Sequence, residues 1–229
     1  MILFHEKAMR GHSRGGWLDS WHTFSFGTFN DPARMGFGNL RVLNEDWIIP
    51  KSGFPRHGHQ DMDILSFVMA GEVRHEDSAG NRSLTRAGEI QLMAAGSGVE
   101  HSEWNLAEEA MAHLYQIWLI PDHPGGPPRY EQAGISATGD VLLAGPEGAG
   151  ALVTLGSDTR LWLRRTVEDG TLPLRVAPGR LLFAQIVDGL AESEGERISA
   201  GDGLQLSSGE ELLLTWQTDG AALVFDMAA

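Results

Sequence analysis

Two histidines two positions apart are the first residues in the chain that could do chemistry together. His57 and His59 lie in the stretch Gly53-Phe54-Pro55-Arg56-His57-Gly58-His59. In an extended strand, side chains two positions apart point to the same face, so both imidazoles can reach one ion. With nine histidines in 229 residues, chance alone gives about a third of one such pair. The pair by itself is therefore compatible with a solvated hairpin edge as well as with a metal site.

A second pair with the same spacing lies further along the chain. His101 and Glu103 stand in Gly98-Val99-Glu100-His101-Ser102-Glu103 and share one face of an extended strand. If the two strands lie side by side, three neutral imidazoles and one carboxylate converge, a ligand set suited to iron, manganese, nickel, copper or zinc. Four protein ligands leave open positions for water or substrate on a six-coordinate metal, which is typical of catalytic rather than closed structural sites.

The composition excludes several other kinds of site and partner. The chain has no cysteine, which excludes disulfides, zinc-thiolate sites and thiol catalysis. Its 31 acidic and 17 basic residues give a net charge of -14, which argues against direct binding to nucleic acid. The N-terminus lacks a basic region followed by an apolar run, and no apolar stretch is long enough to span a membrane. We therefore expect a cytoplasmic protein that does not bind membranes.

Short apolar runs separated by Gly, Pro, Asn and Asp predict an all-β protein. A helical pattern of real length is missing, although residues 25–31 and 105–112 leave room for a short helical turn. Four prolines fall within residues 121–128, where they exclude a helix interior or a central strand, and so predict a linker between two halves. We place the domain boundary near residue 135. The clearest predicted strands cover residues 40–43, 47–50, 64–69, 89–93, 114–120, 161–165, 181–187 and 212–216.

The two halves of the chain repeat one sequence pattern. In each half an apolar strand ends at a glycine turn, at Gly71 and again at Gly189, and a later Ala-Gly-acid turn leads into another strand. The repetition predicts two copies of one β-sandwich. No histidine occurs after residue 123, and in the aligned second copy Leu213 and Thr215 take the places of the ligand pair. The second half therefore cannot repeat the site, and we expect its role to be packing and stability.

The ligand pairs also carry a family resemblance. His57-x-His59 and Gly98-x-x-His101-x-x-x-Asn105 resemble the two motifs of the cupin superfamily. The surrounding sequence resembles pirin and the bacterial pirin-like proteins, most closely over residues 21–27, 31–38, 91–103 and 116–119. The resemblance covers most of residues 10–121, whereas the C-terminal half is similar only in its general rhythm.

The resemblance implies a bicupin, which consists of two tandem cupin-type (jelly-roll) β-sandwich domains. Residues 1–134 would form the metal-binding domain, and residues 135–229 a cupin-like domain without metal ligands. One divalent metal is implied, with iron as first choice and nickel, manganese, copper, cobalt or zinc as alternatives. General cupins take their acidic ligand from the first motif, where Asp63, or less readily Asp61, is available. Asp63 is expected only behind the ligands, because Asp is shorter than Glu. The implied ligands are His57, His59, His101 and Glu103.

The remaining histidines are expected to be structural or solvated, and the tryptophans to belong to the core. Six histidines have no partner at ligand spacing, and one of them, His22, lies in an aromatic-rich segment where it could hydrogen-bond inside the core. Trp104 is the tryptophan with a claim to a place near the pocket, because it follows Glu103 directly. The six histidines are His5, His12, His22, His75, His113 and His123.

The resemblance further implies a metal-dependent dioxygenase of the quercetin 2,3-dioxygenase type, which opens the ring of flavonols such as quercetin. Its substrates would be the aromatic flavonol and dioxygen, and Glu103 would be the catalytic residue, either as a ligand or as the acceptor of the hydroxyl proton. The alternative is a metal- or redox-sensitive regulator that binds a protein partner without turnover. A storage-type cupin without chemistry fits four intact ligands less well. We expect a monomer, and flavonol turnover separates the first two functions.

Overall fold

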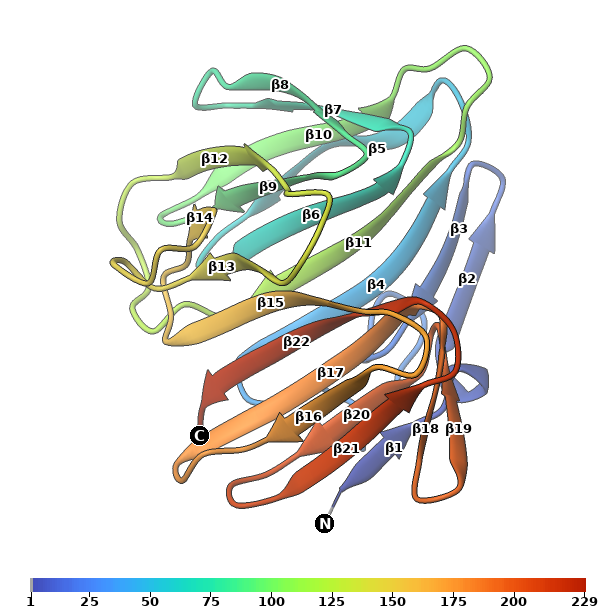
Figure 1. Ribbon diagram of the computed structural model, residues 1–229. Coiled ribbons are helices and arrows are strands. Elements are labelled where there is room, and N and C mark those ends of the chain that lie inside the picture. The colour runs from blue at the N-terminus through green and yellow to red at the C-terminus, as the bar shows by residue number, and fades with distance from the viewer. Residues whose placement is uncertain (1) are drawn as a thin grey trace. The chain divides into compact units, whose positions relative to one another are not determined.

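The structure, a computed structural model, describes residues 2–229, and nearly all of their regular structure is β-strand (Figure 1). The predicted all-β class is confirmed. Among these residues one short 3-10 helix, η1 (Lys7–Met9), is present. The chain forms two compact units. We call residues 11–135 with 152–157 the N-terminal unit, and residues 2–10, 136–151 and 158–229 the C-terminal unit.

The N-terminal unit is a β-sandwich of two antiparallel sheets. The seven-stranded sheet has the order β12-β9-β6-β11-β4-β3-β2, and the four-stranded sheet has the order β5-β10-β7-β8. The longer sheet contains β2 (Gly11–Gly15), β3 (Leu18–His22), β4 (Leu40–Ile48), β6 (Asp63–Ala70), β9 (Glu89–Ala94), β11 (Ala112–Leu119) and β12 (Arg129–Gly134). The shorter sheet contains β5 (Ser52–His59), β7 (Glu72–Asp77), β8 (Arg82–Arg86) and β10 (Val99–Asn105).

The interior of this sandwich changes from apolar to polar and back along each central strand. On β6, Ile64 and Val68 belong to two separate apolar clusters, and the fully buried Ser66 lies between them. Buried polar groups are costly unless they are hydrogen-bonded, so the apolar clusters must stabilise the sandwich on either side of a polar middle. The same order recurs on β11 as Leu114, Gln116 and Trp118.

Strand β4 shows where the sequence pattern misled. Residues 40–43 and 47–50 were predicted as two strands, because the intervening Asn44, Glu45 and Asp46 suggest a turn; the structure has one continuous strand, Leu40–Ile48. All three polar residues are buried, and β4 lies between β3 and β11. The two short helical turns envisaged are likewise replaced, since residues 25–31 form a turn with the bridge Phe26↔Phe29 and residues 105–112 contain no helix.

The proline-rich segment of residues 121–128 connects β11 to β12, two strands of the same sheet in the N-terminal unit. It is fastened to that unit by hydrogen bonds from the amide N–H of Ser97 to the carbonyl of Gly126 (2.8 Å) and from the N–H of Gly125 to Asp61 (2.6 Å). It therefore serves here as an ordered connection within one unit. The short strand β14 (Val153–Thr154) returns to this unit, where the N–H of Thr154 donates to Glu131.

The C-terminal unit has two antiparallel sheets of its own. Within the unit one sheet has the order β1-β20-β17-β22-β15-β13 and the other the order β16-β21-β18-β19. The first contains β1 (Leu3–His5), β13 (Val141–Gly145), β15 (Thr159–Thr166), β17 (Arg180–Asp188), β20 (Gly203–Leu206) and β22 (Gly220–Ala228). The second contains β16 (Thr171–Arg175), β18 (Leu190–Ser193), β19 (Glu196–Ser199) and β21 (Glu211–Trp216). The N-terminal strand β1 thus pairs with β20, far along the sequence.

One apolar cluster joins both sheets of the C-terminal unit. It includes the fully buried Ile186, Leu204 and Trp216. Apolar side chains fill the middle of this sandwich, where the N-terminal unit has polar ones. This packing fits the expected role of the second half in stability.

The repeated sequence pattern has the same backbone geometry in both units. Gly71 and Gly189 both have positive φ, 71° and 83°, as do Gly88 and Gly201, 80° and 95°. In the first unit the N–H of Gly88 donates to Val68, and in the second the N–H of Gly201 donates to Ile186. Positive φ is cheap only for glycine, which explains why these glycines stand at matching positions. The matching turns support duplication of one sandwich.

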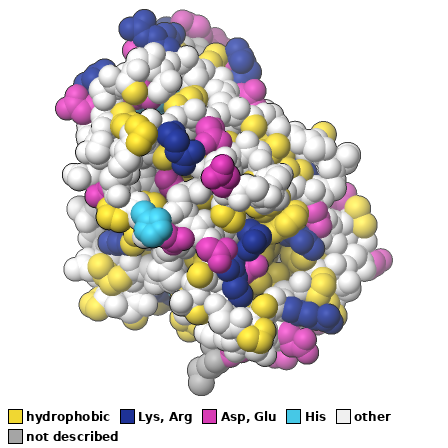
Figure 2. All heavy atoms as spheres, turned by 90° about the vertical axis from the view of Figure 1, so that its left-hand side faces the viewer, with side chains coloured by type: hydrophobic (Ala, Val, Ile, Leu, Met, Phe, Trp, Pro, Cys, Tyr) yellow, Lys and Arg dark blue, Asp and Glu magenta, His cyan; other side chains and the backbone are white. Residues whose placement is uncertain are grey.

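Basic and acidic side chains lie side by side on the surface shown in Figure 2. The ion pairs include Arg129–Glu131 and Arg180–Asp158, both 2.7 Å long. That nucleic acid is not bound remains a prediction from the net charge. Among residues 2–229, no helix has both the length and the apolar composition needed to span a membrane.

Candidate metal centre

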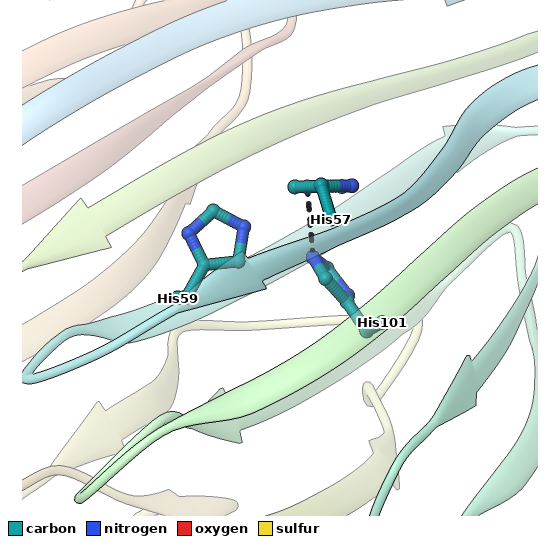
Figure 3. Close-up of side chains that lie close together, drawn as sticks. All are labelled: His57, His59 and His101. Atoms are coloured by element: carbon teal, nitrogen blue, oxygen red, sulfur yellow. Dashed lines mark hydrogen bonds between the residues drawn. The ribbon is translucent and has the colours of Figure 1, made fainter.

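Strand pairing brings three of the predicted ligands together. In the register of β5 with β10, His101 lies directly opposite His57, and His59 follows two positions later on the same face. Their rings meet in Figure 3, where His57 and His59 come from β5 and His101 from β10. One ring nitrogen of each lies within 4.8 Å of the others. His101 is almost fully buried and the other two are partly exposed, so the cluster is open on one side.

Hydrogen bonds on the far side of two rings set which nitrogen faces the cluster. Nδ1 of His57 donates to the carbonyl of Pro55 at 2.7 Å, which leaves the lone pair on Nε2. Nε2 of His75 donates to Asp77 at 3.0 Å, so Nδ1 of His75 can accept from Nδ1 of His101 at 3.5 Å. The chain Asp77–His75–His101 therefore also leaves a lone pair on Nε2 of His101.

Burial favours the neutral form of two of these imidazoles, those of His59 and His101. Burial and, to a smaller extent, the neighbouring His57 together lower the pKa of His59 from 6.5 to about 4. Burial also lowers the pKa of His101 far below its ordinary value, with His57 and His59 adding to the effect. A neutral imidazole is the form that binds a metal ion.

The cluster passes a simple test of fit to a metal. Nε2 of His57 and Nε2 of His101 are 3.2 Å apart, and two lone pairs at that distance repel each other unless a cation lies between them. Two ligand nitrogens about 2.1 Å from a metal and at right angles to each other are separated by about 3 Å. The spacing and the tautomers therefore match those of neighbouring ligands on one metal ion.

Glu103 lies deeper in the sandwich than the three histidines. The register of β10 with β5 is interrupted between His101 and Glu103, so Glu103 pairs with Phe54 instead of continuing the histidine register. Its carboxylate atoms group with His75 and His101 within 4.8 Å, and not with His57 and His59. The structure thus gathers the three histidines and places Glu103 beside His101, on the buried side of the cluster.

Three side chains of the facing sheet hold the Glu103 carboxylate. Ser66 and Gln91 donate to Oε1 at 2.8 Å and 2.6 Å, and Gln116 donates to Oε2 at 2.7 Å. These donors are the polar middle of β6, β9 and β11, paired in register across the sheet. The hydrogen bonds satisfy a carboxylate that is only 2 % exposed and fix its position.

His75 is the residue at this site that the sequence reasoning missed. It was grouped with the structural or solvated histidines, but it is fully buried against His101, and Tyr130 stacks on its ring at 4.7 Å. A signal was available in the sequence. His75-Glu76-Asp77 repeats the two-residue spacing of the ligand pairs, and this spacing puts the ring and the carboxylate on one face of β7.

The cluster opens into a cavity of about 720 Å³ inside the N-terminal unit. Its aromatic walls include Phe26 and Trp118, whose rings meet edge to face at 5.5 Å, and Trp118 also contacts His59 at 4.8 Å. Trp104, the tryptophan expected near the pocket, does not line it, because neighbours of Glu103 along β10 point to the opposite face. Trp118 takes that place.

Asp63 is found away from the histidines. It begins β6, and its Oδ2 accepts a hydrogen bond from the N–H of Gly156 at 2.6 Å. It is buried, and burial raises its pKa above the ordinary value. Among residues 2–229 it is neither in the metal-ligand groups nor in the wall of the cavity. The hydrogen bond to Gly156 does not connect Asp63 to any of the four proposed ligands, so it does not support the expected position behind them.

Comparison with known proteins shows which family this site and fold represent. The profile of the Pirin family matches residues 4–119, and the profile of the quercetinase C-terminal cupin domain matches residues 142–227. A quercetin 2,3-dioxygenase of Escherichia coli K12 is 39% identical over 228 residues, which are 99% of each chain. A pirin-like protein of Caulobacter vibrioides is 34% identical over 224 residues, covering 95% of this chain and 96% of that relative.

Solved structures extend the match to three dimensions. The crystal structure of the bacterial pirin YhhW from Escherichia coli in complex with nickel(II) has a TM-score of 0.94 and 39% identity, and the match covers 100% of this chain and 99% of the other. A quercetin 2,3-dioxygenase from Acinetobacter baumannii, at 21% identity and a TM-score of 0.80, shares the fold. With family profiles matching both halves and relatives matching over nearly the full length, this bicupin chain belongs to the pirin family.

Proposed function

We propose that the protein is a metal-dependent dioxygenase that opens the ring of flavonols such as quercetin. The observation that carries the proposal is the open cluster of three imidazoles on the wall of a cavity large enough for a drug-sized aromatic ligand. The names of the full-length relatives support the same activity. One divalent metal is proposed, with iron as first choice, while the nickel(II) complex of the bacterial pirin makes nickel a serious alternative. The proposed ligands are His57, His59, His101 and Glu103.

The chain's own residues prepare this site for a phenolic substrate. A bound divalent metal would act as a Lewis acid toward the oxygens of the substrate and as the site for dioxygen chemistry. His57 and His101 present their Nε2 lone pairs because Pro55 and His75 occupy the opposite nitrogens. Phe26 and Trp118 line the cavity and offer apolar ring surfaces to an aromatic substrate.

Glu103 is proposed as the residue that accepts the proton of the substrate hydroxyl. In the structure its two oxygens already receive three hydrogen bonds, from Ser66, Gln91 and Gln116. These donors fix the position of the carboxylate on the cavity side of β10. The three hydrogen bonds use three of the roughly four lone-pair sites of a carboxylate, so Oε2 keeps one site that could accept the proton.

Metal content and oxygen uptake test the proposed function. Protein purified without chelator or added metal should contain about one equivalent of divalent metal per chain, and flavonol-dependent oxygen uptake should disappear with chelation and return with the native metal. If metal-loaded protein takes up no oxygen with any flavonol, a regulator that binds a protein partner replaces the enzyme as the better assignment. The domain limits 1–134 and 135–229, the cytoplasmic location and the monomeric state stay predictions alongside it.

A further inference from the structure

The cavity has a second polar wall, which holds no metal-ligand candidate. It consists of Ser20 and His22 on β3 and Asn44 and Asp46 on β4, all of which line the cavity and are at most 2 % exposed. They belong to the seven-stranded sheet, while the three histidines belong to the four-stranded sheet. The cavity therefore has polar groups on both sheets, and aromatic side chains such as Phe26 and Trp118 also line it.

The four polar residues form one patch because the strands pair in register. Ser20 lies directly opposite Asp46, and His22 lies directly opposite Asn44. Ser20 donates a hydrogen bond to Oδ1 of Asp46, and the ring of His22 bonds Oδ1 of Asn44 through Nδ1 at 2.9 Å. Nε2 of His22 in turn accepts from the hydroxyl of Ser13 at 2.8 Å. The patch is thus held rigidly by its own hydrogen bonds.

These contacts leave a donor and an acceptor for a ligand. Oδ1 of Asn44 is bonded to His22, so the Nδ2 amide of Asn44 is its available donor. Oδ1 of Asp46 is bonded to Ser20, so Oδ2 of Asp46 is its available acceptor. Asn44 and Asp46 are two positions apart and share the cavity face of β4. A phenolic hydroxyl donates one hydrogen bond and accepts another, so it complements this pair.

Three other buried polar residues of this sheet are explained by the Glu103 carboxylate that they hold. Ser66, Gln91 and Gln116 donate to Glu103, which accounts for their burial. The carboxyl of Asp46 has no basic partner among its contacts, and burial, with Glu103 and Glu45 as further causes, raises its pKa to about 7. A buried carboxyl without a neighbouring cation destabilises the folded protein. A ligand that hydrogen-bonds to this carboxyl would reduce the destabilisation.

We propose that Asp46 and Asn44 form a second subsite, which binds a hydroxyl group of the aromatic substrate other than its metal-binding oxygens. The inference rests on the proposed function, because it takes the substrate to be a polyhydroxylated flavonol. Asp46 accepts from this hydroxyl and Asn44 donates to it, while the aromatic side chains of the cavity contact the rings. The subsite selects flavonols by their additional hydroxyls, independently of the oxygens that face the histidines.

Binding of two flavonols to the nickel(II)-loaded protein, under nitrogen so that no oxygen is consumed, tests the subsite. Quercetin carries additional hydroxyls, and unsubstituted 3-hydroxyflavone has only the metal-binding oxygens. The quantity measured is the ratio of their two dissociation constants, obtained by titration calorimetry. The wild type should prefer quercetin by about tenfold or more, the value of one hydrogen bond to a buried charged group. Asp46→Leu should bring the ratio to about one by weakening quercetin alone.

Two further variants guard against trivial explanations. Asp46→Asn keeps the shape and the Ser20 contact but not the charge, and it should reduce the ratio by a few fold even if the leucine variant folds poorly. Asp63→Asn removes another buried carboxylate of the same unit, outside the cavity, and should leave the ratio unchanged. Metal content is measured in every variant.

Each result points to a different conclusion. The subsite is overturned if the ratio is unchanged in both Asp46 variants, or if both ligands bind more weakly by the same factor. In that case continued flavonol binding and turnover would still support the proposed function. If metal-loaded wild type binds neither flavonol, the proposed function fails and the subsite fails with it. Loss of preference confined to the Asp46 variants establishes the subsite.

Discussion

The buried carboxyl of Asp46 should make the metal-free protein less stable at neutral pH than it would be with a neutral side chain there. Asp46 is 1 % exposed, and its pKa is raised from 3.8 to about 7, chiefly by burial. Asp46→Asn keeps the size and a hydrogen bond with Ser20 but cannot ionise. We therefore expect this variant to unfold at a higher denaturant concentration than the wild type at pH 8.

The sign and size follow from proton linkage. Between pH 3.8 and 7 the folded state holds the Asp46 proton that the unfolded chain has lost, so the free energy of unfolding falls as pH rises through this window. A pKa raised from 3.8 to about 7 corresponds to about 4 kcal/mol at 1.36 kcal/mol per pKa unit. Part of this is returned by relaxation around the ionised group, so a gain of about 2 kcal/mol in the variant is expected above pH 7.

Urea unfolding of chelator-treated wild type and Asp46→Asn at pH 4, 6 and 8 measures this difference. The two proteins should be nearly equal at pH 4, and the variant should become progressively more stable up to pH 8. Asp63→Asn should change stability with pH in the same direction, because burial raises the pKa of Asp63 as well. A difference that is constant with pH, or a variant less stable at pH 8, would refute the reasoning, because it would mean that Asp46 is ionised at no cost.

Other perturbations test the metal centre and its supports. Alanine at any of the three cluster histidines should lower metal affinity by roughly 100-fold or more with little change in circular dichroism, and cooperative loss of folding in all three would instead mark the metal as structural. Glu103→Gln should keep appreciable metal but lose flavonol turnover by about 100-fold; equal oxygen uptake at matched metal occupancy would remove Glu103 as the base. His75→Phe keeps a ring under Tyr130 but removes the acceptor for His101, so metal affinity should fall by roughly 10- to 100-fold, and an unchanged binding isotherm would contradict the Asp77–His75–His101 chain. The pKa of His59 is lowered from 6.5 to about 4, so the free energy of unfolding of the metal-free protein should fall as pH falls through that window. In urea unfolding over the same pH range, His59→Ala should lose less of its free energy of unfolding than the wild type.

The sequence alone determined the fold class and most of the strands. Apolar runs bounded by turn residues marked β6, β9, β11, β15, β17 and β21 to within a few residues, because a buried strand must be apolar and a turn needs glycine or a polar residue. The matching glycine turns predicted a repeat that has the same hydrogen bonds in both units. The spacing of His57 with His59 put both rings on one face, because a strand alternates with a period of two.

Only the tertiary structure decided which strands and which polar residues meet. The register of β10 between β5 and β7 brings His101 to His57 on one side and to His75 on the other, and nothing local to β7 specifies that neighbour. Asn44 and Asp46 suggested a turn and lie instead inside β4, facing the cavity. Polar residues can occupy a buried strand when partners from distant segments satisfy them, as Ser20 and His22 do here. Such partners become neighbours only when the sheets assemble, so a sequence pattern cannot distinguish a polar cavity wall from a loop.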